Sequence, residues 1–336
     1  MRFYTLLIFT ASFFSQTLVG QEAVNTSSPE CILAANRLVD EAFTLMKQHY
    51  YRKDSVQWDE LISSVKTRLS KSTDCAAAQE ALQWCFKEMK ERHSFVMPAK
   101  KAEVYNGNIN SSGLASLGQL SGPINYELVE SDIAYINIPW LTSADKNICT
   151  AFADSIQQVI AAFDKQGVTK WIIDLRNNTG GNCWPMLAGL GPLLGNGVHG
   201  YFVSADEKIP FSYQDGAVMQ SRHTRCTVSN PYKLITTPRS IVVLTGPNTA
   251  SAGEIVAIAF KGRKNVQLYG EPTAGLTTAN ATYKLSDGSL LVLTVCKEAD
   301  RHGNIFEGRI QPDQLVASIR GKDAVKSAAL MFLQIE

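Results

Sequence analysis

The 336-residue chain lacks the features that mark several classes of protein. Its formal net charge is only +1, which gives no reason to expect a nucleic acid or an anionic membrane surface as a partner. Its five histidines and seven cysteines form no H-x-x-x-H or C-x-x-C pair, so no metal site is expected. No apolar run is as long as a membrane-spanning helix. The remaining composition, 45% apolar and 19% charged, is typical of a globular protein of one large or two smaller domains.

The first twenty residues differ from the rest of the chain. A basic start, Met1-Arg2, precedes the apolar run FYTLLIFTASFF and then SQTLVG. About a dozen apolar residues are too few for a stable membrane anchor but suit the core of a secretory signal peptide. We therefore predict a signal peptide over residues 1–20, cleaved after Gly20, and a secreted or periplasmic protein. A buried N-terminal strand is the alternative.

The cysteines of a secreted chain would meet an oxidising compartment, where disulfides form. Their number is odd, so at least one thiol stays free or pairs between chains. None of them lies at a predicted helix start or beside a histidine, the settings that activate a catalytic thiol. Cysteine catalysis is therefore not favoured.

Residues 21–100 are predicted to form a small helical N-terminal domain. Ser28-Pro29-Glu30 offers an N-cap, a proline at the first helical position and an acid in the first turn. Two further segments carry apolar residues at helical spacing: Trp58, Leu61, Ile62, Val65 and Leu69, and then Ala78, Leu82, Phe86 and Met89. Their apolar faces require a partner, and the Gly-, Ser- and Asn-rich stretch 106–122 is typical of a linker to it.

Residues 101–336 are predicted to form an α/β core domain with a mainly parallel sheet, because strand-like and helix-like segments alternate along it. The predicted strands cover 133–141, 170–177, 239–246 and 266–271, the predicted helices cover 143–166 and 251–261, and a pair of strands turns at 286–289. Residues 203–232 are predicted to be a long loop. Ligand sites of such sheets gather beyond the carboxyl ends of the strands.

Two segments follow predicted strands at that edge. DLRNNTGGN, residues 174–182, contains Gly180-Gly181, which lets backbone amides approach a ligand as an oxyanion hole requires; a glycine turn before a helix gives the same pattern. GPNTASAGE, residues 246–254, places Ser251 and Glu254 at the spacing of a capping box. The same strand-to-helix turn would also display a nucleophilic serine. The local sequence leaves both roles open for Ser251.

A nucleophilic serine needs a base, because its hydroxyl attacks poorly until the proton is removed. The candidates are His49, His93, His199, His223 and His302. In KERHSFV, His93 lies where the last helix of the front domain gives way to an extended segment, from which it could reach the strand ends of the core. A boundary histidine without a catalytic role would occupy the same position.

Four short motifs, DLRNNTGG, TASAGE, GEPTAG and FEGRIQPD, occur in this order between about residues 130 and 315. In this order they resemble the C-terminal processing and tricorn-type serine peptidase family, whose members include tail-specific proteases. The resemblance implies a crotonase- and Clp-protease-like α/β core with Ser251 as the nucleophile. It also implies an oxyanion hole made by the amide of Gly180 or Gly181 and the amide of Ala252.

The chain departs from the Ser-Lys branch of that family, which carries a lysine 25 residues after the serine. Here that position is Leu276, in GEPTAGLTT. ERHSFV resembles the histidine-containing segment of the other branch, which assigns the base to His93. The same resemblance makes Glu307, in FEGRIQPD, the candidate carboxylate beside the imidazole, with a loop ion pair to an arginine as its alternative role. The serine that tricorn-type members carry before the histidine is replaced by Arg92.

The resemblance thus implies a serine-type endopeptidase that forms an acyl-enzyme on Ser251 and acts on peptides or unfolded proteins. Residues 94–132 are too few for a PDZ module, so substrate choice is expected to depend on the front domain and on core loops, where Trp140 and Trp184 could line a pocket. A non-catalytic member that holds a peptide or an apolar ligand in the same cleft is the alternative, because the family's lysine is missing. Neither function implies a cofactor.

Overall fold

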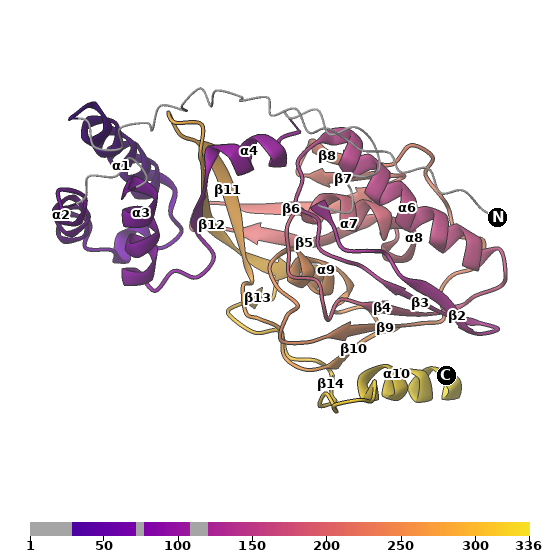
Figure 1. Cartoon of the computed structure of the whole chain (residues 1–336). Coiled ribbons are helices and arrows are strands. Elements are labelled where there is room, and N and C mark those ends of the chain that lie inside the picture. Colours follow the sequence, from indigo (N-terminus) through magenta and orange to yellow (C-terminus); the bar gives the residue numbers. More distant parts are fainter. Residues whose placement is uncertain (1–28, 72–76, 108–119) are drawn as a thin grey trace, which may run out of the picture.

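The computed structural model describes residues 29–71, 77–107 and 120–336. The predicted signal peptide and most of the predicted linker lie outside these ranges. Figure 1 shows a group of helices at one end of the molecule and two sheets with their covering helices at the other. No helix within the described ranges is both long enough and apolar enough to cross a bilayer.

The helical end consists of three helices and one short 3-10 turn: α1 (Pro29–His49), η1 (Lys53–Ser55), α2 (Trp58–Leu69) and α3 (Ala77–Glu88). Their apolar faces meet in one buried cluster that includes Met46, Leu82 and Phe86. The same cluster contains Leu291 and Leu293 from a strand of the core. The helical stripes predicted from the sequence are therefore covered by a sheet as well as by one another. Cys31, on α1, is disulfide-bonded.

One sheet has six strands in the order β14-β10-β9-β4-β3-β2, and every pairing except β2–β3 is parallel. Its strands are β2 (Tyr126–Glu130), β3 (Ile133–Asn137), β4 (Lys170–Asp174), β9 (Ser240–Thr245), β10 (Val266–Gly270) and β14 (Gln314–Leu315). Every residue of β4 and β9 is buried, as expected for central strands covered on both faces. The parallel pairings join the strands predicted from the sequence, but the prediction of a mainly parallel core is not confirmed, because the core contains a second, larger sheet that is antiparallel.

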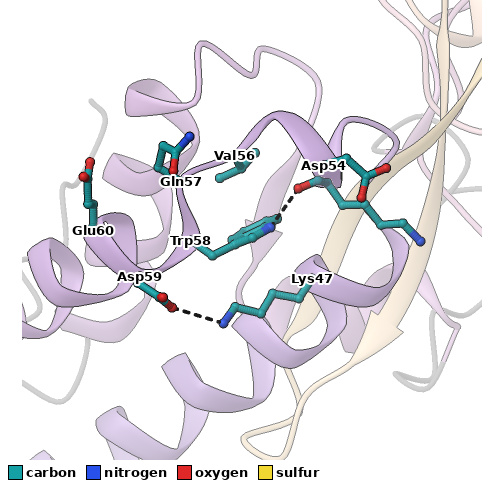
Figure 2. A pocket seen from close by; sticks show the side chains of 8 residues that line it. Lys47, Asp54, Val56, Gln57, Trp58, Asp59 and Glu60 are labelled. Atoms are coloured by element: carbon teal, nitrogen blue, oxygen red, sulfur yellow. Dashed lines mark hydrogen bonds and ion pairs between the residues drawn. The ribbon is translucent and has the colours of Figure 1, made fainter.

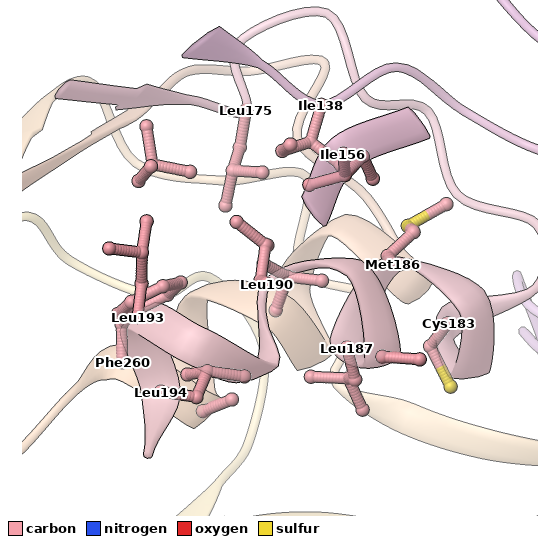
Figure 3. Close-up of a cluster of buried hydrophobic side chains, with 14 of the residues drawn as sticks. Ile138, Ile156, Leu175, Cys183, Met186, Leu187, Leu190, Leu193, Leu194 and Phe260 are labelled. Atoms are coloured by element: carbon pink, nitrogen blue, oxygen red, sulfur yellow. The ribbon is translucent and has the colours of Figure 1, made fainter. Parts of the chain in front are cut away.

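Helices cover both faces of the six-stranded sheet. Side chains that alternate along its strands divide between two clusters, because successive strand residues point to opposite faces. One face packs on α6 (Lys146–Asp164), α7 (Cys183–Gly189), α8 (Gly191–Leu194) and α9 (Ala252–Phe260), and the other on α10 (Ala324–Ile335). Figure 3 shows α7 and α8 directing Met186, Leu187, Leu190 and Leu193 into the larger cluster.

The second sheet has eight strands, and all of its pairings are antiparallel. Its strands are β1 (Phe95–Met97), β5 (Gly197–Val203), β6 (Lys208–Gln214), β7 (Ala217–Gln220), β8 (His223–Thr227), β11 (Thr278–Lys284), β12 (Leu290–Asp300) and β13 (Ile305–Phe306). The long loop predicted over 203–232 is wrong, since most of it belongs to β6, β7 and β8. Strands with one exposed face contain many polar residues, so their composition is similar to that of a loop.

Strand β1 connects the helical end to this second sheet. It pairs with β12, with Phe95 opposite Val292 and Met97 opposite Leu290, and the helix α4 (Ala99–Tyr105) follows it. The loop that precedes β1 therefore lies against the core, although the rest of the N-terminal segment is helical. His93 belongs to that loop.

Candidate active site

Ser251 occupies the turn between β9 and α9 in a backbone conformation that side chains rarely adopt, with φ 52° and ψ −114°. Neighbouring hydrogen bonds hold the turn: the hydroxyl of Thr249 donates to the Leu175 carbonyl at 2.8 Å and accepts from the Gly246 amide at 3.0 Å. Strained backbone maintained by its surroundings is found at sites where a side chain must be displayed.

His93 meets Ser251 although 158 residues separate them in the chain. The Nε2 atom of His93 lies 2.8 Å from Oγ of Ser251, and its Nδ1 atom lies 2.9 Å from Oγ1 of Thr278, at the start of β11. In the tautomer that carries its proton on Nδ1, the ring donates to Thr278 and presents a lone pair to the serine hydroxyl. That arrangement is the one in which a histidine can take the proton of a serine.

Glu91 and Asn280 hold the backbone of His93 in place. One carboxylate oxygen of Glu91 accepts from the amides of His93, at 2.7 Å, and Ser94, at 3.2 Å, while the other accepts from the Tyr50 hydroxyl at 2.8 Å. From the opposite side, the Asn280 amide donates to the His93 carbonyl at 2.9 Å. The imidazole is therefore positioned from two sides. The helical end acts through Tyr50, and the antiparallel sheet acts through Asn280.

Burial lowers the pKa of His93 from its ordinary 6.5 to about 4. Two weaker effects oppose the burial, namely the negative charge of Glu91 and a hydrogen bond to Thr278. The pKa falls because removing an imidazole from water penalises its charged form. The ring is accordingly neutral at pH 7, which is the form that accepts a proton.

Glu254 links the serine turn to the segment that carries Thr278. Its fully buried carboxylate accepts from the Ser251 amide at 2.9 Å, the Thr273 hydroxyl at 2.5 Å, the Gly275 amide at 2.9 Å and the Leu276 amide at 2.8 Å. Burial raises its pKa, and these hydrogen bonds oppose the increase because they favour the ionised form. The residue expected mainly to cap α9 also joins both sides of the site.

The two adjacent glycines lie directly against the serine turn. A Cβ at Gly180, where φ is 111°, would come within 3.0 Å of Cβ of Ser251. The Gly180 amide donates to Oδ1 of Asn178 at 3.0 Å, so a protein acceptor already occupies it. Gly181 donates to no acceptor among the described residues, and Ala252 is the first residue of α9, where an amide has no intrahelical partner.

Glu307 does not contact His93. Its exposed carboxylate forms an ion pair with Lys297, which lowers its pKa, while Thr278 takes the place beside Nδ1 that was expected for Glu307. Ser94 is buried, accepts from the Thr294 amide at 2.9 Å and donates to the Thr294 hydroxyl at 3.1 Å. It therefore fixes β1 on β12 and does not replace the serine missing before the histidine.

Sequence reasoning missed two partners of His93, Thr278 beside its ring and Glu91 at its backbone amide. Thr278 lies two residues after Leu276, the position where Ser-Lys relatives were expected to carry their base, and this proximity was an available signal. Glu91 lies two residues before His93, but nothing in its local pattern separates it from a solvated carboxylate. Within the described ranges, no group of three or more His, Cys, Asp or Glu side chains could hold a metal ion.

A cavity of about 360 Å³ opens beside His93. It is lined by Tyr51, Arg52, Lys90, Glu91, Arg92, His93, Gly275, Leu276, Thr277, Thr278, Lys297, Phe306, Glu307 and Gly308. Figure 2 shows a different cavity of about 620 Å³ on the helical end, where Lys47 reaches towards Asp59 and the Trp58 indole donates to a backbone carbonyl. That second cavity contains none of the residues around Ser251, so the cavity beside His93 is the one related to this chemistry.

Comparisons with known proteins relate this chain to a family of peptidases. The sequence profile of peptidase family S41 matches residues 132–316, which is more than half of the chain. The nisin-resistance protein of Lactococcus lactis subsp. lactis is 30% identical over 262 residues, or 77% of this chain and 76% of that relative. A carboxyl-terminal-processing protease of Synechocystis is 29% identical over 204 residues, but the match covers only 42% of its length.

Solved structures share the fold. A lipoprotein from Streptococcus agalactiae superposes with a TM-score of 0.71 at 23% identity, covering 90% of this chain and 96% of that one. A photosystem II D1 C-terminal processing protease gives 0.53 at 16% identity, covering 84% and 93% of the two chains. With the family profile matched over more than half of its length, the chain belongs to peptidase family S41.

Proposed function

We propose that the protein is a serine-type endopeptidase that hydrolyses peptide bonds through an acyl-enzyme on Ser251. The observation that carries this proposal is the 2.8 Å separation between Nε2 of His93 and Oγ of Ser251. A neutral imidazole at this distance can remove the hydroxyl proton as the oxygen attacks. Membership of the peptidase family supports the same chemistry.

In the first half of the reaction, His93 takes the proton of Ser251, and Oγ forms a bond to the carbonyl carbon of the substrate. The carbonyl oxygen becomes an oxyanion, which we assign to the amides of Gly181 and Ala252, because the Gly180 amide already donates to Asn178. The protonated His93 then gives its proton to the leaving amine as the peptide bond breaks. The acyl group stays on Ser251.

In the second half, His93 takes a proton from the water that attacks the acyl carbon, and returns it to Oγ of Ser251 as the ester bond breaks and the acid is released. Thr278 orients the ring through its hydrogen bond to Nδ1, and its hydroxyl accepts this bond in the tautomer that the mechanism uses. A hydroxyl carries no charge, so it stabilises the imidazolium less than a buried carboxylate would. The site is then a Ser-His pair oriented by a threonine, with Glu307 outside it.

The substrates we propose are peptides or unfolded proteins, held without a cofactor. We further propose that residues 1–20 form a cleaved signal peptide, that a helical domain extends to about residue 100 before a crotonase- and Clp-protease-like core, and that the protein is secreted or periplasmic. The disulfide bond of Cys31 supports an oxidising compartment. The relative named for resistance to nisin, and the structural neighbour named as a lipoprotein, are consistent with action outside the cytoplasm.

A serine-directed fluorophosphonate probe, combined with hydrolysis of an unfolded protein followed by mass spectrometry, tests the proposal. We expect the protein to be labelled and to cleave the substrate. Ser251→Ala should abolish both activities, and His93→Ala should strongly reduce both. A folded protein that binds peptides but is neither labelled nor active would establish the alternative, a non-catalytic member that uses the same cleft.

A further inference from the structure

Asn178, between β4 and the two glycines, is a fully buried residue that the proposed chemistry does not use. Its Nδ2 atom donates to the carbonyls of Ile138 at 3.0 Å and Pro139 at 3.2 Å, just after β3, and its Oδ1 atom accepts from the Gly180 amide at 3.0 Å. Its backbone carbonyl accepts from the Ala250 amide at 3.0 Å. One residue therefore joins the end of β3, the glycine pair and the serine turn.

The position requires a side chain that accepts one hydrogen bond and donates two. A side-chain amide supplies both roles at once, whereas a carboxylate of the same shape can only accept and a methyl group can do neither. The short side chain of asparagine also reaches the amide two residues ahead, which is the geometry of an Asx turn. Removing it would leave the Gly180 amide and two buried carbonyls without these partners, which is costly.

The bonds of Gly180 fix the direction of the Gly181 N–H. While Asn178 holds the Gly180 amide, the Gly180 carbonyl accepts from the Leu141 amide at 3.4 Å. The carbonyl and the N–H of one trans peptide point in opposite directions, and the described residues contain no cis peptide, so the Gly181 N–H points away from Leu141. Two successive glycines with φ of 111° and 104° have wide conformational freedom, so this direction depends on the bonds that hold them.

The second proposed oxyanion donor, the Ala252 amide, is placed from the same residue. Ala250, whose amide is held by the Asn178 carbonyl, lies two residues before Ala252. A Cβ at Gly253 would come within 2.8 Å of that same carbonyl oxygen, so α9 begins in contact with Asn178. Both donors are therefore placed relative to one buried residue.

We propose that Asn178 is a positioning residue that sets the separation of the two oxyanion donors. Its side chain holds the glycine pair, its carbonyl holds the start of α9, and its burial means that it acts through these segments and not by contact with the substrate. The inference rests on the proposed peptidase function. An oxyanion hole acts on the charge that develops in the transition state, so a displaced donor should lower kcat and leave KM nearly unchanged.

The test measures stabilisation of the transition state separately from binding of the substrate. A cut site located by mass spectrometry is made into a fluorogenic peptide and into a peptidyl trifluoromethyl ketone, which forms a tetrahedral adduct with a reactive serine. For Asn178→Ala we expect kcat to decrease about 100-fold, since loss of one oxyanion donor costs roughly 10²–10³ in kcat. KM should change by less than about threefold, and the Kd of the ketone should increase by the same factor as kcat/KM decreases.

Gln157→Ala is the matched control, because Gln157 is also a buried amide that joins separate segments. Its Nε2 atom donates to the Ala188 carbonyl at 2.8 Å and the Tyr213 hydroxyl at 3.2 Å, and its Oε1 atom accepts from the Tyr232 amide at 2.8 Å. Its removal should lower the midpoint of thermal unfolding, as Asn178→Ala does, but should leave kcat and the affinity for the ketone unchanged.

If Asn178→Ala does not fold, Asn178→Asp takes its place. A carboxylate can still accept from the Gly180 amide, but it cannot donate to the two carbonyls after β3, and its negative charge opposes a nearby oxyanion. The same pattern is expected, with kcat decreased and KM preserved.

A folded Asn178→Ala protein with unchanged kcat, or with a loss no greater than that of Gln157→Ala, would overturn the inference. A decrease in kcat/KM that comes from KM alone would overturn it as well. Either result leaves the peptidase proposal intact. A wild-type protein that neither hydrolyses peptides nor binds the ketone would instead refute the peptidase proposal and, with it, the role of Asn178.

Discussion

Replacement of Thr278 by valine tests whether a neutral hydroxyl can orient the imidazole. Valine keeps the shape of threonine but cannot accept the hydrogen bond from Nδ1 of His93, which is 2.9 Å long in the resting site. Between two neutral groups such a bond contributes about 0.5–1.5 kcal/mol, and when His93 becomes an imidazolium it contributes about 1.5–3 kcal/mol. The loss is therefore greatest in the transition state, where the ring carries the proton.

The resting enzyme loses the neutral bond as well, so the barrier rises by the difference between the two losses, about 1–1.5 kcal/mol, which corresponds to a decrease of roughly 5- to 13-fold in kcat/KM, mostly in kcat. This is smaller than the roughly 10⁴-fold decrease known for a triad aspartate, because threonine supplies no charge to the imidazolium. Steady-state hydrolysis of a fluorogenic peptide measures it, with Thr278→Ser as the control that restores the hydroxyl and should recover activity to within a few-fold. A folded Thr278→Val enzyme with unchanged kcat would refute the role of Thr278.

Three further predictions follow from the buried charges. Because burial lowers the pKa of His93 to about 4, kcat/KM should decrease on acidification with a midpoint near pH 4–5, and a midpoint at 6.5 would contradict a desolvated base. Burial raises the pKa of Glu298, whose carboxylate oxygens have no hydrogen-bond partner among the described residues, so the native state keeps a proton that the unfolded chain releases above about pH 4.5. Stability should then fall by up to about 1.4 kcal/mol per pH unit as pH rises, and Glu298→Gln should remove this contribution in urea unfolding between pH 5 and 8. Arg176→Ala should lower the free energy of unfolding by about 2 kcal/mol, since it leaves the buried Asp174 unpaired, whereas Arg222→Ala should change it by less than about 0.5 kcal/mol.

The central strands of the parallel sheet could be predicted because burial on both faces leaves a simple pattern. KWIID and SIVVLT contain the unbroken apolar runs WII and IVVL and coincide with β4 and β9, within the predicted strands 170–177 and 239–246. Among the antiparallel strands, the pair β11 and β12 was predicted from its turn at 286–289, whereas β6, β7 and β8 gave no comparable signal. HTRCT forms β8 with only Cys226 buried, so its composition is that of a loop, and only its pairing with β7 makes it a strand.

The partners of the site residues depend on how segments far apart in sequence come together. The ordered motifs pointed to Ser251, the resemblance of ERHSFV pointed to His93, and these two side chains meet. The expected partner of the imidazole, Glu307, lies near Lys297, and an exposed ion pair forms there. Thr278 is the residue opposite Lys297 across β11 and β12, so it occupies the strand end next to His93 instead. No local sequence pattern could have predicted this register of β11 against β12.

The register of β1 also explains why the base needs the helical end of the molecule. His93 lies two residues before β1, and a shift of one residue along β12 would turn every side chain of β1 to the opposite face. A strand of three residues defines its register weakly, so other contacts must supply the precision that proton transfer requires. Tyr50, directly after α1, holds Glu91, and Glu91 holds the His93 amide. In the proposed reaction the N-terminal helices therefore act through the position of one imidazole, although none of their described residues hydrogen-bonds to Ser251.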